Sequence, residues 1–499
     1  MEYGRKEIFT DVPYITNENI KDILRKAIST HRQNILSIDY LLNYEAGDQP
    51  LKRVKQFRKD IDCQCVDNIA NEVTEFNLGF KWGNPITLVQ RGEHTGEDEI
   101  KAVSILNDCY EAENIKTKTQ KLGRFVEIDA IGYTYVDVNM DWQDGDSYFN
   151  IETLDPRSTF IVRSNYYLDK RVMLGVTYYT DEHGQEYYTC YTKDTRFDLA
   201  GLNEIINEEW NPLGRVPVVE WIRSYDRMGC FERQISEMDN LNLLVSDFTN
   251  DVEQNTQAIW HTNDVDFPTK IVTNEDGTTT EEVVKPKTND WMQTFTSPDG
   301  KTPFVKPLAI DYNYQGMLSN ITNRRSLILQ KCNVPQRNDN SGGSTGVAMS
   351  DATGWSSAEM AASKQQNIME ACKMEEVKAV LAAIKISPFV PADSPLLKLR
   401  YSDIQPNIKR QKTYELTVKT NAICALLAKG FSLEDTLTIA PLFEDPNQVV
   451  VRSGAGVRKY QESNVFKDEQ QQSEEKRPFA DYSDQENNSP NIGGMEKEN

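Results

Sequence analysis

The spacing of apolar residues predicts that the chain starts with helices. Ile20, Ile23, Leu24 and Ala27 share one stripe at a helical repeat, and similar stripes follow further along. The helices predicted in this part span residues 17–42, 65–78 and 99–119, with 125–132 continuing the last. The first is expected to close at Gly47 and the second before Gly79.

From Tyr133 the pattern changes to that of β-strands. Short segments rich in aromatic and β-branched residues are separated by turn sequences such as Gln143-Asp144-Gly145. The predicted strands span residues 133–140, 148–154, 160–163, 172–179 and 186–191. An antiparallel sheet region is therefore expected to run to about Trp221.

A long helix is predicted after Gly229. Its apolar stripe consists of Phe231, Ile235, Met238, Leu241, Val245, Phe248 and Val252. Such a stripe usually faces the protein's own core. A polar insertion at 260–304, with a predicted β-hairpin turning at Asn274, separates this helix from another at 316–332. Two helices are thus expected to bracket a small β-structured excursion.

A glycine-rich loop and further helices are predicted in the last third. Gly342, Gly343 and Gly346 would cost too much backbone entropy in a regular element, so residues 338–354 are predicted to form a loop. A capping box at 356–359 indicates the start of a helix. The predicted helices span residues 357–386, 406–427 and 432–440, the last capped by Ser432. Beyond residue 456 the charged, Gln/Asn-rich composition predicts disorder.

The composition narrows the classes of function. The net charge is −22 at pH 7 and the pI is about 4.8. Because phosphate binding needs clustered Lys and Arg, a repressor, nuclease or polymerase is disfavoured. An acidic wall does suit a protein that lets DNA pass without holding it. No apolar run approaches the roughly 18 residues of a membrane span, and the N-terminus lacks a signal-peptide core. The protein is therefore expected to be made and kept in a cytoplasm unless assembly carries it elsewhere, without a membrane partner.

Residues for catalysis or metal binding are few. The four histidines lie far apart, and of eight cysteines only Cys63 and Cys65 are close, which predicts reduced, partly buried thiols. Neither catalysis nor a cofactor nor a metal is expected.

Two motifs look like ligand-binding loops. The glycine-rich run resembles a phosphate loop, but Val347 follows Gly346 where the motif needs lysine. Residues 141–152 resemble a calcium loop with Glu152 at its twelfth position, but the glycine stands fifth rather than sixth. A tight acidic turn is predicted there instead.

Several stretches agree in order and spacing with one family. They include Asn-Pro-Leu-Gly-Arg-Val-Pro-Val-Val at 211–219 and Thr-Gly-Val-Ala-Met at 345–349. The others are 68–73 with 83–86, 154–156 with 160–162, 239–246 with 250–251, 333–335, and 406–407 with 432–436. Together they resemble the portal proteins of long-tailed phages of Gram-positive bacteria, from about residue 17 to 451. Residues 341–344 depart from the family pattern by extra Gly and Ser.

The resemblance implies an α+β portal fold and a ring, usually of twelve subunits, at one capsid vertex. Its implied parts are an α/β wing (1–230), stem helices (231–259 and 309–337), a small β-containing clip (260–308), a tunnel loop (338–355), a spine helix (356–386), an α-helical crown (387–456) and an acidic tail (457–499). The ring would conduct double-stranded DNA during packaging and ejection. Implied partners are the terminase large subunit, head-completion and tail-connector proteins, scaffold and major capsid protein.

Three groups of residues are candidates for function. The DNA-facing tunnel-loop residues are Asn340, Ser341, Gly342, Gly343, Ser344, Thr345, Gly346, Ser350 and Asp351. Weak phosphate contacts, or with equal weight intersubunit ion pairs, are expected of Arg324, Arg325, Lys331, Arg337 and Lys364. The docking turn that the resemblance implies in the clip is Asn274, Glu275, Asp276 and Gly277. Without a phosphate loop in this chain, ATP hydrolysis is assigned to the packaging partner. Competing interpretations are a minor head protein without a ring and an acidic cytoplasmic hydrolase.

Overall fold

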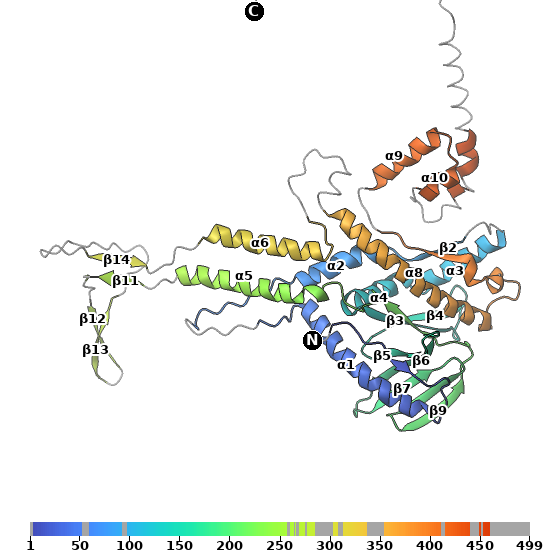
Figure 1. The fold of residues 1–499 in the computed structure, drawn as a ribbon, viewed down its shortest axis with the longest axis horizontal. Helices are drawn as coiled ribbons and strands as arrows, with labels where there is room; N and C mark the ends of the chain where they lie inside the picture. Colours follow the sequence, from blue (N-terminus) through green and yellow to red (C-terminus); the bar gives the residue numbers. More distant parts are fainter. Residues whose placement is uncertain are drawn as a thin grey trace, which may run out of the picture. The chain divides into compact units, whose positions relative to one another are not determined.

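The computed structural model shows a chain of helices and small sheets (Figure 1). It describes residues 3–51, 59–91, 97–256, 260–263, 265, 269–274, 277–284, 303–307, 313–336, 354–410, 415–439, 449–450 and 453–459. Contacts group the chain into two compact units, Met1–Gln411 and Lys412–Asn499. The α+β class predicted from sequence is confirmed.

The N-terminal helices are close to those predicted. They are α1 (Ile20–Ala46), α2 (Ile69–Lys81), α3 (Glu97–Ala112) and α4 (Ile115–Asp129). Gly47, in the left-handed region, ends α1 as expected. The prediction that the second helix ends before Gly79 is wrong. Helix α2 continues through Lys81, because the side chains of Phe80 and Lys81 are buried against the rest of the unit. The predicted helix 99–119 is also wrong as one element, since Asn114 at φ 53° separates α3 from α4.

Two sheets follow, where one antiparallel region was predicted. The larger has the order β1-β5-β6-β7-β8-β9, with only the β1–β5 pair parallel. Its strands are β1 (Phe9–Thr10), β5 (Thr159–Ser164), β6 (Val172–Thr180), β7 (Glu186–Tyr191), β8 (Thr195–Ala200) and β9 (Glu204–Trp210). The smaller has the order β10-β3-β4, from β3 (Ile131–Val138), β4 (Phe149–Leu154) and β10 (Val218–Ile222).

Helices cover both sheets. Ile20 and Leu24 of α1 pack against Phe160 and Val176 on one face of the larger sheet. Helix α8 (Trp355–Ile386) and α4 pack on the smaller sheet, and their apolar side chains form a shared core with Phe149. Burial of these apolar stripes is the main term that stabilises this part of the fold.

The predicted pair of helices around a β-structured excursion is confirmed. Helix α5 (Ile235–Thr256), preceded by a 3-10 turn at Glu232–Gln234, lies beside α6 (Tyr314–Lys331) (Figure 1). Between them β11 (Trp260–Asn263) pairs with β14 (Phe304–Pro307), and β12 (Thr269–Thr273) pairs with β13 (Thr279–Val283), both antiparallel.

Two predictions near α8 need correction. The helix starts at Trp355 after Gly354 (φ 84°), so Ser356 and Ser357 lie inside its first turn and form no capping box. Ser357 instead donates a hydrogen bond to Asn333 Oδ1 (2.8 Å). The predicted helix 406–427 is wrong over its first residues, which form β15 (Ile404–Asn407).

Strand β15 pairs with β2 (Thr87–Gln90), and this pairing links the segment after α8 to the N-terminal part of the same unit. Short 3-10 turns at Pro395–Lys398 and Tyr401–Asp403 lead into it. Pro406 is tolerated because the β15–β2 sheet has only two strands, so both are edge strands.

The second unit contains α9 (Glu415–Ala428) and α10 (Leu433–Ile439). Ile423 and Leu437 form its buried contact. Gly430 at φ 88° separates the two helices, and the Ser432 hydroxyl caps α10 by accepting the Asp435 N–H (3.0 Å), as predicted. The residues predicted to form a disordered tail lie mostly outside the described residues. Within the described segments, no helix combines the length and the apolarity needed to span a bilayer.

Candidate nucleic-acid interface

The α5–α6 hairpin is anchored at one end. Met238 and Leu241 of α5 and Ile328 of α6 are buried in one cluster with Leu41 and Tyr44 of α1. The predicted stripe on α5 therefore faces the protein's own core at this end, as buried stripes usually do.

Further along α5 the apolar stripe becomes less buried. Phe248 packs edge-on against Tyr314 of α6, and Asn255 donates a hydrogen bond to the Tyr314 hydroxyl. Val252 is 42% exposed, and Leu318 and Leu327 of α6 are similarly exposed. Apolar side chains on two paired helices thus remain available for contacts beyond this chain.

A third element lies along α5 and was not predicted. Asn242, Ser246 and Asn250 are buried at intervals of four residues on α5. Their side chains accept the backbone N–H groups of Asp67 (2.9 Å), Cys65 (3.0 Å) and Cys63 (2.7 Å), in that order. Four helical residues rise about 6 Å and two extended residues about 6.6 Å, so the two spacings match. The hairpin is therefore a three-part unit of α5, α6 and the segment 63–67.

Three of the candidate basic residues have partners in the same chain. Arg325 Nε lies 3.0 Å from Asp67 Oδ2, and the same guanidinium pairs with Glu72. Arg324 and Lys331 both approach Glu237 of α5, at 3.7 and 3.9 Å. Because long, exposed ion pairs contribute little, Arg324 and Lys331 keep most of their capacity to bind other anions, whereas Arg325 links α6 to α2.

The remaining basic candidates differ in their placement. Lys364 is exposed on α8, and within the described residues it has no ion-pair partner. Arg337 and all nine predicted tunnel-loop residues lie outside the described residues. Their contact with DNA stays a prediction.

The predicted clip turn is a β-hairpin turn, as expected. Asn274 N–H donates to the Thr278 carbonyl (2.8 Å), and Gly277 N–H donates to the Asn274 carbonyl (3.0 Å). Gly277 has a positive φ of 80°. Glu275 and Asp276 lie outside the described residues. The pairing of β11 with β14 holds together the two ends of the segment that contains this hairpin.

The buried carboxylate of Glu127 fixes α8 to the sheets. It accepts hydrogen bonds from Gln365 of α8 (2.7 Å), Arg223 (3.0 Å) and Trp82 (3.1 Å), and Lys81 lies 3.4 Å away. Burial alone would raise the pKa of Glu127, but the charges of Lys81 and Arg223 lower it to about 2. The network therefore links α8 to α4, to the end of α2 and to the residue that follows β10.

Of the two motifs that resemble ligand-binding loops, the glycine-rich run lies outside the described residues, and the acidic turn at 141–146 is described. Residues 141–146 form the predicted tight turn, in which Gln143 N–H donates to Asp146 Oδ2 (3.0 Å), and Glu152 pairs with Lys118 instead (3.0 Å). All eight cysteines are free, with Cys63 Sγ 3.5 Å from Cys65 Sγ. Among the described residues, no three His, Cys, Asp or Glu side chains are grouped to hold a metal ion.

One basic segment is not among the candidates predicted from the sequence. Residues 52–59 include Lys52, Arg53, Lys55, Arg58 and Lys59 and no acid. The sequence signal that could have identified this segment is its positive charge, which is opposite in sign to the net charge of the chain. Residues 52–58 lie outside the described residues, and the chain that follows them is the segment bound along α5.

Comparison with known proteins identifies one family. The family described as phage portal protein, SPP1 Gp6-like, matches residues 12–476, a range that covers most of each unit and includes the candidate segments. No curated protein matches the chain.

Proposed function

Because the chain belongs to the SPP1 Gp6-like family of phage portal proteins, we propose a role for each of its parts in a DNA-conducting ring. Portal proteins form the head–tail connector at a vertex of the virion capsid, and this is the function of the chain. The observation that carries the conclusion is the family match over residues 12–476. The family implies a homo-oligomeric ring with DNA, terminase and capsid partners.

The proposed division of the chain follows the elements. Residues 1–230 form the wing, α5 and α6 the stem, the excursion between them the clip, residues 338–355 the tunnel loop, α8 the spine helix and residues 387–456 the crown. The α5–α6 pair around two small β-pairs supports the stem and clip. We propose twelve subunits, since the resemblance implies that number and a closed ring suits heterologous contacts.

We propose that the stem and the tunnel loop line the channel. Residues 338–354 are mostly polar and carry only two charges, Asp339 and Asp351, so they would follow a moving duplex without gripping it. Arg324, Lys331 and Lys364 are the best-placed described residues for transient phosphate contacts, because their ion pairs are long or absent. Arg337 and the basic run 52–59 are further candidates.

The clip is the proposed docking site for the terminase large subunit and, later, for head-completion and tail-connector proteins. Its support is the hairpin turn at Asn274 and Gly277, whose described residues are exposed. Scaffold and major capsid protein are the proposed partners during assembly in the host cytoplasm.

Portal families are structural rather than enzymatic. We propose that this chain has no catalytic activity of its own and needs no cofactor, and that its partner hydrolyses ATP.

Negative-stain microscopy of the purified chain tests the proposed function. Rings with a central hole are expected. A uniformly monomeric protein that enters capsids would favour a minor head protein, and a monomer with hydrolytic activity would favour the acidic hydrolase.

A further inference from the structure

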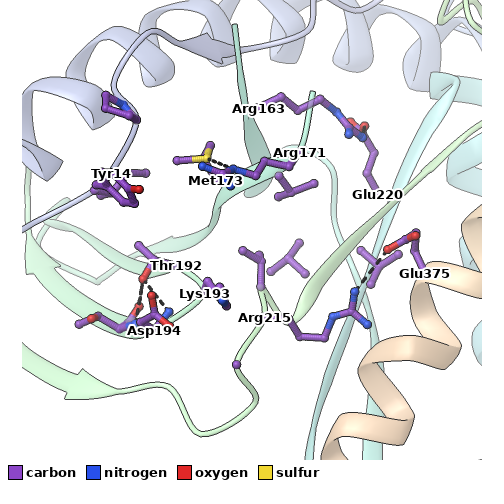
Figure 2. Close-up of a pocket in the computed structure, with 18 of the residues that line it drawn as sticks. Tyr14, Arg163, Arg171, Met173, Thr192, Lys193, Asp194, Arg215, Glu220 and Glu375 are labelled. Carbon is purple, nitrogen blue, oxygen red and sulfur yellow. Dashed lines mark hydrogen bonds and ion pairs between the residues drawn. The ribbon is translucent and has the colours of Figure 1, made fainter. Parts of the chain in front are cut away.

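A pocket of about 860 Å³ lies between the two sheets and α8 (Figure 2). Its wall combines residues 13–16 before α1, the turn between β7 and β8, the strand entry at 214–219 and Glu375 of α8. Tyr14 on its lining is 75% exposed. The channel, clip and crown assignments give this pocket no role.

Three of the four cations on the lining, Arg171, Lys193 and Arg215, are poorly compensated. Arg215 has one long ion pair, to Glu375 (3.4 Å), and burial lowers its pKa, whereas carboxylates raise the pKa of Arg223 and Arg227 elsewhere in the wing. Arg171 pairs with exposed Asp169 (3.2 Å) and otherwise donates to the Met173 sulfur, a weak acceptor (Figure 2). Lys193 is exposed, with no ion-pair partner in the described part of the chain.

Acids in the pocket are better satisfied. Glu220 is buried and binds two arginines, Arg163 (2.9 Å) and Arg227 (2.6 Å). Glu375 is shared between Arg215 and Lys378, which lies closer (2.5 Å). Asp194 is the remaining carboxylate on the lining. The lining carries four cations, Arg163, Arg171, Lys193 and Arg215, against these three carboxylates, and Arg227 also pairs with Glu220, so the charge in excess is cationic.

A second copy of this chain has the matching charge. Each subunit carries a net charge of −22, so assembling subunits repel one another unless local cations meet carboxylates where they touch. Arginine and exposed tyrosine are also the residue types enriched in protein interfaces. In a closed ring the two contacting surfaces of a subunit differ, so a cationic pocket on one side can meet an acidic surface on the other.

We propose that this pocket is a subunit–subunit contact of the ring, in which Arg171, Lys193 and Arg215 bind carboxylates of a neighbouring copy. The inference rests on the proposed ring.

Zero-length cross-linking of wild-type rings tests the contact directly. Rings assembled from equal amounts of unlabelled and ¹⁵N-labelled chains are treated with a carbodiimide, which joins an amine to a carboxylate only where the two touch. Mass spectrometry is expected to show Lys193 joined to an Asp or Glu of the other isotope. Rings in which Lys193 is joined only within its own chain, or not at all, would overturn the inference while leaving the ring intact. Absence of rings in the wild type would overturn both.

Charge reversal provides the second measurement. The double variant Arg171→Glu, Lys193→Glu is expected to raise the dissociation concentration of the ring about tenfold or more, measured by sedimentation velocity. Lys26→Glu with Lys398→Glu is the matched control, because both lysines are exposed and neither lines the pocket. Unchanged melting temperature shows that the variant folds.

Ring stability equal to that of the control would contradict the contact. Normal rings that fail to enter capsids would also contradict it, because the acidic partner would then be a capsid component.

Discussion

At Glu127 of α4, side chains from three other parts of the chain meet on one carboxylate. Lys81 and Trp82 come from the end of α2, Arg223 follows β10, and Gln365 belongs to α8. A buried charge is tolerated only when it is paired and hydrogen-bonded, and here each oxygen has partners. The sequence does not reveal this network, because its members are separated by up to 284 positions.

Replacing Glu127 by Ala is expected to lower the free energy of unfolding by about 3–5 kcal/mol, because Lys81 and Arg223 would remain buried without their counter-charge. Urea unfolding measures the change. Glu75→Ala is the control: Glu75 is exposed and its ion pair with Arg124 is long (3.5 Å), so a loss below about 1 kcal/mol is expected. Equal effects in the two variants would contradict the assigned role of Glu127.

Acid is expected to destabilise the first unit, Met1–Gln411, in two stages. Burial lowers the pKa of His31 from 6.5 to about 4. Between these pH values the unfolded chain binds a proton at His31 and the folded chain does not. The free energy of unfolding therefore falls as the pH drops from 6.5 towards 4. Glu127 and Glu220 have pKa values lowered from 4.5 to about 2, so their contribution is present above pH 4.5 and is lost towards pH 2. Unfolding by urea across this pH range checks both stages, and His31→Gln should flatten only the first. A first stage unchanged in this variant would show that His31 is not its cause.

At the scale of elements, much of the fold follows from residue spacing. The stripe from Phe231 to Val252 predicted α5, and the turn at Asn274 predicted the hairpin between β12 and β13. The predicted element boundaries are wrong where tertiary contacts override the local preference of a glycine or a proline. Gly79 does not end α2, because the residues after it are buried, and Pro406 lies in a strand because β2 pairs with it.

The polar ladder on α5 is expected to hold the segment 63–67. Asn242→Ala with Asn250→Ala should leave the amides of Cys63 and Asp67 without their hydrogen-bond acceptors, so their hydrogen exchange should accelerate strongly. Stability should fall by about 1–3 kcal/mol for each unsatisfied buried group. Hydrogen exchange with mass spectrometry measures this, with exposed Asn367→Ala on α8 as control. Unchanged protection of residues 63–67 would show that the ladder does not hold the segment.

The basic residues of α6 are expected to divide into two classes. Arg324→Glu with Lys331→Glu should leave rings intact and reduce DNA packaging, because their ion pairs with Glu237 are long. Arg325→Glu should instead destabilise the subunit, since it places a third carboxylate beside Asp67 and Glu72. Thermal melting, microscopy and a packaging assay separate the two. Loss of rings in the Arg324 and Lys331 variant would assign these residues to intersubunit ion pairs.

At the scale of the whole molecule, the acidity has a consistent explanation. A net charge of −22 disfavours a protein that holds DNA but suits a wall past which DNA moves. Periodicity alone predicts helices with buried stripes and contains nothing about a ring. The ring and its DNA follow from the family, which the ordered motifs indicated and the match over residues 12–476 showed.

Purified rings are expected to hydrolyse no ATP above the buffer rate, because the glycine-rich run lacks the lysine of a phosphate loop. A phosphate-release assay measures this, with terminase added as the positive control. ATP hydrolysis by the chain alone would contradict the assignment of that step to the partner.

The most direct test of the account is a cryo-electron microscopy map of the assembled ring. The stem helices α5 and α6 and residues 340–351 are predicted to line the central channel, with the hairpin at Asn274 at one open end. A ring in which residues 340–351 lie on the outer rim would contradict the account.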